Sequence, residues 1–256
     1  MILKSRVGNR RYGECSQEVV KDEELKADKQ QELDELTYII SHDLQEPLRM
    51  ITSYVQLLNK RYGDKLDDNA KDYIKYAVDG SNRLKQMMDD LLTYSRIGRP
   101  HFNREDIDPA NAVEKVKSLL KSRYPDSADK IEFAAQKQIV INADKELIIK
   151  LLYHLADNSL KFNNSPKPEI KITADEDDEN WSISVADNGL GINRDYHGKI
   201  FGIFQKLHNH NDYPGSGMGL AICEKIVNKH NGSIRLDSEP EKGSTFHITI
   251  KKKDKA

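Results

Sequence analysis

Cysteine and long apolar runs are both scarce in this sequence of 256 residues. The two cysteines, Cys15 and Cys223, lie far apart in unrelated surroundings, which argues against a disulfide framework or a cysteine-based zinc site. No apolar stretch approaches the roughly 18 to 20 residues of a membrane span, and the N-terminus lacks the apolar core of a signal peptide. We therefore expect a soluble, cytoplasmic fragment, and the sequence leaves open whether the parent protein is membrane-anchored.

An excess of one charge is also missing. The chain has 40 basic and 42 acidic residues, which gives a formal net charge of -2 at pH 7. Proteins that bind duplex nucleic acid usually carry a basic excess, because the phosphate backbone is strongly negative. We therefore expect no nucleic-acid partner.

Proline is rare in the first third of the chain. Between about residues 20 and 96 the only proline is Pro47, and apolar residues recur at spacings of three and four, as on one face of a long helix. The repeat comprises Leu33, Leu36, Ile40, Leu44, Leu48, Ile51, Val55 and Leu58, and then, after the break "RYGDKLDDNA", Ala70, Ile74, Ala77, Ser81, Leu84, Met88, Leu91 and Ser95. We predict a helical hairpin over residues 21–98, preceded by an upstream tail or linker over residues 1–20. One hairpin cannot cover its own broad apolar stripes, so the pattern favours a homodimeric four-helix bundle.

The remainder of the sequence has a different style. Glycine and proline in "RIGRPHF" interrupt the helix, and we place the domain boundary near Gly98 to Pro100. Strand-like segments follow, namely "IEFAA", "QIVIN", "PEIKITADE", "WSISVAD", "SIRLDS" and "STFHITI", with helical segments at about 109–121, 144–162 and 219–230. We therefore predict an α+β protein, in which the hairpin precedes an α/β sandwich with a mixed sheet over residues 99–256.

Three polar and glycine-rich boxes in the second domain indicate a ligand site: "YHLADNSLKFNN" (153–164), "DNGLGI" (187–192) and "GSGMGLAICEKIV" (215–227). In the last box, glycines at alternate positions allow close backbone approach, and the helix that follows offers free N–H groups to an anion. Asp187 comes at the end of a predicted strand, where its carboxylate can accept a hydrogen bond from an exocyclic amino group of a purine. The boxes predict a cradle for a phosphorylated ligand.

The first predicted helix contains a second candidate, "SHDLQEPLR" at residues 41–49. At roughly 100° per residue, His42 lies about 200° round from Ile40. We expect Ile40 and Leu44 to point inward and His42 to face solvent. Pro47 removes a helical donor and crowds the carbonyl group of Asp43, so we expect a local bend.

These boxes, in this order, resemble two-component sensor histidine kinases, particularly the kinase modules of phytochrome-like and other PAS-linked sensors. The resemblance covers about residues 30–250 and also includes "IFGIFQKLH". It implies a phosphoacceptor hairpin followed by an ATP-binding domain of the type shared with gyrase and heat-shock chaperones. The implied activity is ATP-dependent phosphorylation of His42, followed by transfer to an aspartate of a response-regulator receiver domain. The implied assembly is a homodimer with an upstream sensory domain.

The resemblance also assigns roles by position. His42 corresponds to the nucleophile, Asp43 to its hydrogen-bonding partner, Lys206 to a cation facing the terminal phosphate, and Asn158 to the Mg²⁺ ligand. The positions that correspond to nucleotide-binding residues are His154, Asn158, Lys161, Asp187, Gly189, Gly191, Gly215, Gly217, Gly219, Leu220 and Thr245. Phe201 and Phe204 resemble aromatic residues that pack a mobile lid, which we expect at about residues 194–218.

Several positions depart from the family pattern. His154 replaces an asparagine, and Gly202 replaces a side chain, which should loosen a short helix. Glu46 stands where the family often has threonine or asparagine, which can orient a water molecule for dephosphorylating a partner. An ionised carboxylate cannot donate that hydrogen bond, which argues against phosphatase activity by the usual route. Gln45 is the candidate substitute for the missing donor. The departures keep open a pseudokinase scaffold that binds nucleotide without transfer, and an ATPase is a further alternative. The "HNHND" stretch at 208–212 needs no zinc.

Overall fold

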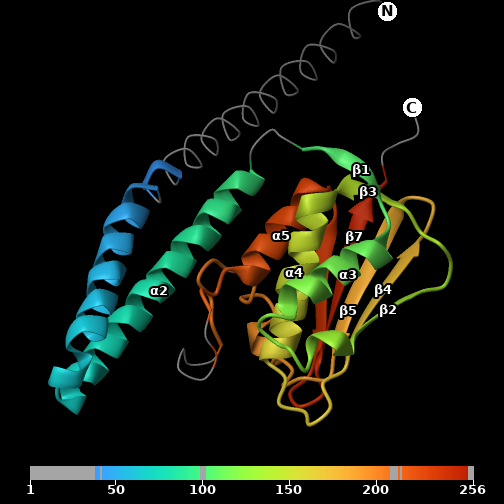
Figure 1. The fold of residues 1–256 in the computed structure, drawn as a ribbon. Coiled ribbons are helices and arrows are strands. Elements are labelled where there is room, and N and C mark those ends of the chain that lie inside the picture. Colours follow the sequence, from blue (N-terminus) through green and yellow to red (C-terminus); the bar gives the residue numbers. More distant parts are fainter. Residues whose placement is uncertain (1–37, 41, 99–101, 208–212, 214, 253–256) are drawn as a thin grey trace, which may run out of the picture.

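The computed structural model describes residues 38–40, 42–98, 102–207, 213 and 215–252. Its first part is a hairpin of two helices (Figure 1). The first helix is described at residues 38–40 and 42–62, a short 3-10 turn η1 follows at Gly63–Lys65, and α2 spans Asp68–Ile97. The Asp67 carboxylate caps α2 by accepting a hydrogen bond from the Ala70 amide at 2.7 Å. The break predicted at residues 61–70 is therefore the turn of the hairpin.

The first helix leaves much of its apolar stripe uncovered. Leu48 is buried, but Ile40 and Leu44 are 55% and 52% exposed. In the single chain these two residues stay exposed, because one opposing helix covers only part of the face, and their inward orientation stays a prediction for the dimeric bundle. Other large apolar side chains exposed on the hairpin are Ile39, Met50, Ile51, Tyr54, Leu57, Leu58, Tyr62, Tyr73, Tyr76 and Leu84.

The second part contains a five-stranded sheet with the order β2-β4-β5-β7-β6. Its strands are β2 Ile131–Ala135, β4 Ile170–Glu176, β5 Asn180–Asp187, β6 Ser233–Ser238 and β7 Ser244–Lys251. The β2–β4 pair is parallel and the other neighbours are antiparallel, so the predicted mixed sheet is confirmed. A separate antiparallel pair joins β1 (Arg104–Ile107) to β3 (Ile141–Asp144). Strand β1 was not predicted, because three of its four residues are charged.

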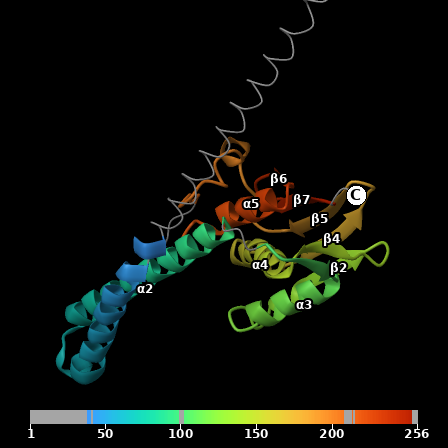
Figure 2. The same ribbon diagram turned by 90° about the horizontal axis from the view of Figure 1, so that it is seen from above.

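Three helices cover one face of the sheet (Figures 1 and 2). They are α3 (Pro109–Leu120), α4 (Lys145–Lys161) and α5 (Gly219–Lys229), within about two residues of the predicted bounds. The side chains of Asp108 and Asp144 cap the first two. Along β5 every second residue turns towards the helices, so Trp181, Ile183 and Val185 join the core while their neighbours are less buried.

The end of α2 is part of this second core. Ile97 is only 3% exposed, and Leu91 and Tyr94 pack against the same cluster. The ammonium group of Lys225 on α5 lies 4.1 Å from the centre of the Tyr94 ring. The hairpin and the sheet domain therefore meet through α2 and α5.

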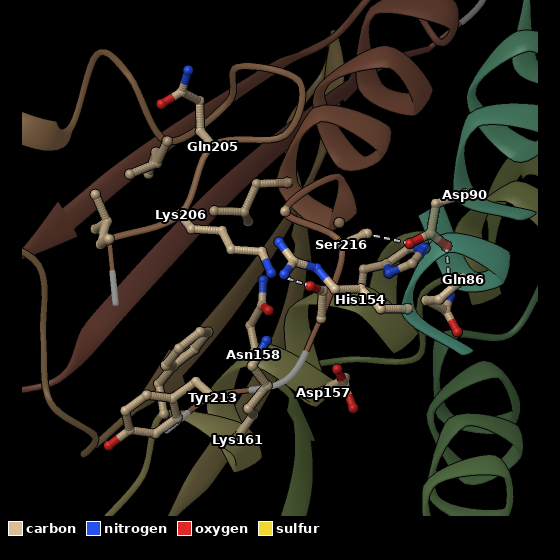
Figure 3. Close-up of a pocket in the computed structure, with 18 of the residues that line it drawn as sticks. Gln86, Asp90, His154, Asp157, Asn158, Lys161, Gln205, Lys206, Tyr213 and Ser216 are labelled. Carbon is tan, nitrogen blue, oxygen red and sulfur yellow. Dashed lines mark hydrogen bonds between the residues drawn. The ribbon is translucent and has the colours of Figure 1, made fainter. Parts of the chain in front are cut away.

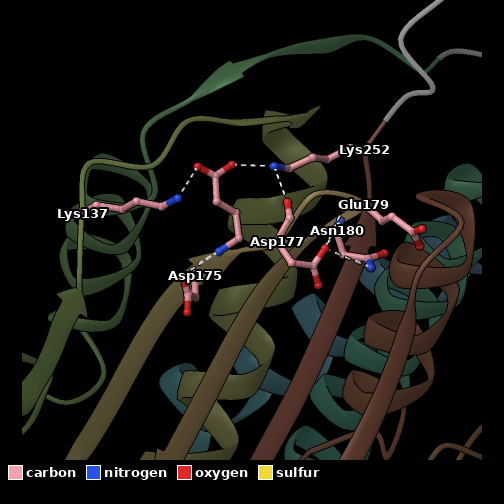
Figure 4. A network of polar contacts seen from close by, with 7 residues as sticks. Lys137, Asp175, Asp177, Glu179, Asn180 and Lys252 are labelled. Carbon is pink, nitrogen blue, oxygen red and sulfur yellow. Dashed lines mark hydrogen bonds and ion pairs between the residues drawn. The ribbon is translucent and has the colours of Figure 1, made fainter.

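A polar network joins chain segments at the end of the sheet opposite Asp187 (Figure 4). The Glu176 carboxylate lies 2.7 Å from Lys252 Nζ and 3.1 Å from Lys137 Nζ. These contacts lower the pKa of Glu176, with the Lys252 hydrogen bond as the main cause. Lys252 also donates to the Asp177 carbonyl oxygen at 2.7 Å. The network fixes the ends of β4 and β7, and we assign it a structural role.

Within the part of the chain that the structure describes, no helix combines the length and apolar character that crossing a membrane requires.

Candidate functional site

A large cleft opens between the helices of the sheet domain and the side of α2 (Figure 3). Its volume is about 930 Å³. Ten of the predicted site residues line it: His154, Asn158, Lys161, Asp187, Gly191, Lys206, Gly215, Gly217, Gly219 and Leu220. All three boxes of the second domain therefore contribute to a single cavity.

Asp187 lies at the last position of β5 and is held by three donors. Its Oδ1 accepts hydrogen bonds from the amides of Gly189 at 2.9 Å and Ser244 at 3.2 Å. Its Oδ2 accepts from the Ser159 hydroxyl at 2.9 Å. Burial raises the pKa of the carboxyl group, and the three hydrogen bonds act in the opposite direction by favouring the charged form. The result is an oriented acceptor in the wall of the cleft.

Asn158 and Lys161 come from α4, where a spacing of three places them on the same side of the helix. Lys161 Nζ lies 4.4 Å from the centre of the Phe162 ring, and burial lowers its pKa. A Cβ at Gly215 would approach Lys161 Nζ to 2.9 Å, so the absence of a side chain there lets the cation lie against the loop. The pair brings an amide group and a cation to the same part of the cleft.

The glycine box forms a loop that leads into α5. Gly217 has a φ of +82°, and a Cβ there would lie 2.8 Å from the Gln205 carbonyl oxygen. Met218 occupies the N-cap position of α5 without a side-chain cap, so N–H groups of the first turn are available to a ligand. Lys206 Nζ donates to the Gly215 carbonyl oxygen. Backbone donors and a cation thus surround the same loop.

His154 also lines the cleft, opposite the start of α5. A Cβ at Gly219 would lie 3.4 Å from His154 Nδ1. Burial lowers the pKa of His154 to about 4, and the nearby positive charge of Lys150 acts in the same direction. His154 is therefore neutral at pH 7 and can offer one N–H group, as the asparagine it replaces would.

Thr245 is not among the residues that line the cleft, whereas its neighbours Ser244 and Phe246 are. Successive residues of β7 point to opposite faces of the sheet, so the one-residue difference decides which side chain meets the cavity. We correct the expectation accordingly: Ser244 is the residue beside Asp187. Gly189 does not line the cleft either, but its amide positions Asp187, and a Cβ there would lie 2.6 Å from the Phe162 carbonyl oxygen.

Ser159 was missed by the sequence analysis, although it lies inside one of the boxes. Its hydroxyl is nearly inaccessible, with the residue 3% exposed. Its partner Asp187 is 28 positions away, so no local pattern could have indicated the contact.

Only one of the two aromatic residues expected to pack at the lid is packed. Phe201 packs against the core, but Phe204 is 43% exposed and has a φ of 60°. The chain around Gly202 forms turns instead of a short helix, which agrees with the low helix propensity of glycine. Residues 208–212 and 214, within the expected lid, lie outside the described residues, and so does the "HNHND" stretch.

His42 and Asp43 lie on the first helix and do not line the cleft. His42 Nδ1 is 3.2 Å from Asp43 Oδ1, and the two side chains are 70% and 72% exposed. The expected contact between the neighbours is therefore present, and it uses Nδ1 of the imidazole, not Nε2. Gln45 Nε2 donates to Asp89 Oδ1 at 2.8 Å, which joins the two hairpin helices and engages the residue considered as a substitute for Glu46.

A direct contact joins the glycine loop to the hairpin. The Ser216 hydroxyl donates to Asp90 Oδ2 on α2, and Gln86 Nε2 donates to Asp90 Oδ1 at 3.0 Å (Figure 3). Burial raises the pKa of Asp90, while both hydrogen bonds favour its charged form. In this arrangement α2 forms one wall of the cleft.

Two family models match the chain. Residues 32–100 match the His Kinase A (phospho-acceptor) domain, and residues 143–254 match the histidine kinase-, DNA gyrase B-, and HSP90-like ATPase. The chain therefore belongs to the two-component sensor histidine kinases. Its α+β fold and the ATP-binding type of its second domain agree with this membership.

Among individual proteins, the chain is similar to the phytochrome-like protein Cph1 of Synechocystis sp., with 40% identity over 86% of this chain and 29% of the relative. It thus spans less than a third of that relative. Two solved structures share the fold: full-length ShkA in complex with AMPPNP, and histidine kinase ThkA in complex with the response regulator protein TrrA. ShkA has a TM-score of 0.62 and 24% identity, covering 84% of this chain and 45% of that one. ThkA has a TM-score of 0.61 and 22% identity, covering 92% and 67%.

Proposed function

We propose that this chain is the ATP-dependent kinase module of its protein, that it phosphorylates its own His42, and that it passes the phosphoryl group to an aspartate of a receiver domain. The observation that carries the proposal is the cleft, in which an oriented carboxylate, a glycine loop and two lysines from separate segments meet. We divide the module into a dimerisation and phosphotransfer hairpin at residues 21–98 and a catalytic domain at residues 99–256.

The cleft residues fit a nucleotide in one orientation. The adenine ring lies at Asp187, whose Oδ2 accepts a hydrogen bond from the exocyclic amino group. The phosphates lie at the glycine loop and the start of α5, where N–H groups, Lys161 and Lys206 offset their charge.

The donors present also fit a magnesium ion. No cluster of three or more His, Cys, Asp or Glu side chains that could hold a metal occurs in the described part of the chain. Mg²⁺ keeps several waters and binds substrate phosphates, so the single amide oxygen of Asn158 suffices as its protein ligand. When bound, the ion neutralises charge on the phosphate oxygens.

His42 supplies the nucleophile. The Asp43 carboxylate accepts a hydrogen bond from the N–H group at Nδ1, which leaves the lone pair of Nε2 free for attack. A bond forms between Nε2 and the γ-phosphorus, the bond from that phosphorus to the bridging oxygen breaks, and ADP leaves. Asp43 stabilises the positive ring of the product. In the receiver step, the N–P bond breaks as an aspartate oxygen bonds to phosphorus.

The separation of His42 from the cleft makes a rearrangement part of the proposal. Either the catalytic domain leaves α2 and approaches His42 of its own chain, or it serves His42 of a second subunit. The exposed apolar residues of the hairpin support a homodimer, in which both routes are available. An upstream sensory domain, as the relatives' phytochrome-like names suggest, would bias this rearrangement.

The test is a labelling experiment with radioactive γ-phosphate. We expect acid-labile, alkali-stable label on the wild-type chain and none on His42→Gln, while His247→Gln, which changes a partly exposed histidine outside the cleft, labels normally. Asn158→Asp should need more magnesium and label at least about tenfold more slowly, because the added charge alters the metal site. Full labelling of His42→Gln would refute the assignment. Nucleotide binding without label at any magnesium concentration would instead support a pseudokinase scaffold.

A further inference from the structure

We propose that Ser159 is a positioning residue for base recognition, which fixes the Asp187 carboxylate so that the cleft selects a purine with an amino group at position 6. The inference rests on the proposed function, because it takes the cleft to be a nucleotide site. It adds a residue to which neither the family resemblance nor the comparisons assign a role.

The contact is shielded from water on the serine side, while the carboxylate is partly buried in the wall of the cleft. Ser159 lies on α4 directly after Asn158, and it is 3% exposed. Its hydroxyl is 2.9 Å from Asp187 Oδ2, on the neighbouring strand β5. A hydrogen bond to a partly buried carboxylate is stronger than one at the surface, since water competes less well there. Ser159 therefore restrains the rotation of this carboxylate.

The hydrogen bonds leave one acceptor position for a ligand. Each oxygen of an ionised carboxylate has about two lone-pair sites. Oδ1 accepts from the amides of Gly189 and Ser244, which occupies both sites. Oδ2 accepts from Ser159 and retains one site. Asp187 lines the cleft, so a ligand donor is directed to Oδ2.

This geometry distinguishes two kinds of purine. An amino group at position 6 donates to Oδ2, whereas a carbonyl oxygen at position 6 would meet a second acceptor. Without the serine hydroxyl, Oδ2 loses its fixed donor and the buried carboxyl group protonates more readily, because one of the hydrogen bonds that favour its charged form is gone. A protonated carboxyl group can donate to a carbonyl oxygen. Loss of Ser159 should therefore weaken the preference for an amino group.

The experiment compares dissociation constants of ATP and inosine triphosphate, the 6-oxo analogue, for the full chain by calorimetry. For wild type we expect tighter binding of ATP. For Ser159→Ala we expect the ratio of the two constants to fall by about tenfold or more, mainly through weaker ATP binding. Thr173→Val is the matched control, because it removes another hydroxyl of the same domain, 2.5 Å from Ser184 Oγ and outside the lining of the cleft. It should leave the ratio unchanged.

Three outcomes overturn the inference. If Ser159→Ala lowers the melting temperature but keeps the wild-type ratio, Ser159 only stabilises the fold. If wild type binds both nucleotides equally, Asp187 does not select the amino group. If wild type binds neither nucleotide, the proposed function fails together with this inference. In the first two outcomes ATP still binds, so only the inference fails. Should Ser159→Ala not fold, Ser159→Cys, which keeps the volume but is a weaker donor, is judged by the same ratio.

Discussion

Burial shifts the pKa values of several single residues in the cleft. Asp187 and Asp90 have raised pKa values and Lys161 and His154 lowered ones, with burial as the first cause in each case. Each shift favours the neutral form of the group, because burial penalises charge. Bound phosphates would act in the opposite direction on the two basic groups, because negative charge favours their protonated forms.

His154 gives a pH-dependent prediction. Its pKa is about 4 in the folded chain and about 6.5 when unfolded, so between these values the unfolded state binds more protons. The contribution of His154 to stability is therefore fully present above about pH 6.5 and is lost as the pH falls towards 4. We expect wild type to lose about 1–3 kcal/mol relative to His154→Asn between pH 7 and pH 4.

Denaturant unfolding of the nucleotide-free chain at several pH values measures this difference. The control is His247→Asn, since the side chain of His247 is 41% exposed beside Asp237. Parallel stability curves for wild type and His154→Asn would show that the histidine is solvated and that its pKa is unshifted.

The elements around the site depend on a few close backbone approaches. The turn after β5 passes the connection between β6 and β7 so closely that a Cβ at Gly191 would lie 1.9 Å from the Glu239 carbonyl oxygen. The Glu241 amide donates to the Leu190 carbonyl oxygen at 2.7 Å across the same approach. These contacts hold the cleft wall at the end of the sheet.

We predict that Gly191→Ala destabilises the catalytic domain by at least about 2 kcal/mol, because the position combines a φ of +67° with the backbone clash. Gly198→Ala is the matched control, since a Cβ there meets nothing within 4 Å. Its effect should stay within about 0.5 kcal/mol. Thermal unfolding of both variants is the measurement, and similar melting temperatures for the two would contradict this account of the turn.

At the scale of the whole molecule, two surfaces bear on the proposed function. One is the contact of α2 with the catalytic domain, which includes buried Ile97. Helix α2 ends at Ile97, and Gly98 is its C-cap with φ -66° and ψ -21°, which agrees with the interruption predicted at "RIGRPHF". Pro100, the other residue at the predicted domain boundary, lies outside the described residues. The second surface is the exposed apolar face of the hairpin.

We predict that Ile51→Asp converts a dimer into a monomer. Ile51 is 54% exposed in the single chain and belongs to the apolar stripe of the first helix. Burying two unpaired carboxylates in a bundle core would cost several kcal/mol. Val140→Asp is the control, because Val140 is similarly exposed, at 47%, in the catalytic domain. Sedimentation equilibrium decides between the outcomes: a dimer that persists in Ile51→Asp would place the dimer contact elsewhere.

Features set by short stretches of chain followed from the sequence alone. The hairpin turn, the bounds of α3, α4 and α5, and the glycine loop before α5 all depend on caps, spacing and backbone freedom within a few residues. The contact between His42 and Asp43 is equally local, since the two residues are neighbours in the sequence. The exposure of the His42 side chain agrees with its predicted position on the solvent side of the helix. The family resemblance extended this local information to the identity of the ligand.

The tertiary structure alone decided which of these residues meet. Ser159 lies 28 positions from Asp187, and Ser216 lies 126 positions from Asp90. Such contacts depend on how helices pack and strands pair, which no local pattern records. The reason is clearest at β7, where the sequence predicted Thr245 at the site and the structure has Ser244 there. Strand side chains alternate between the two faces of a sheet, so a prediction that is wrong by one residue names a side chain on the opposite face.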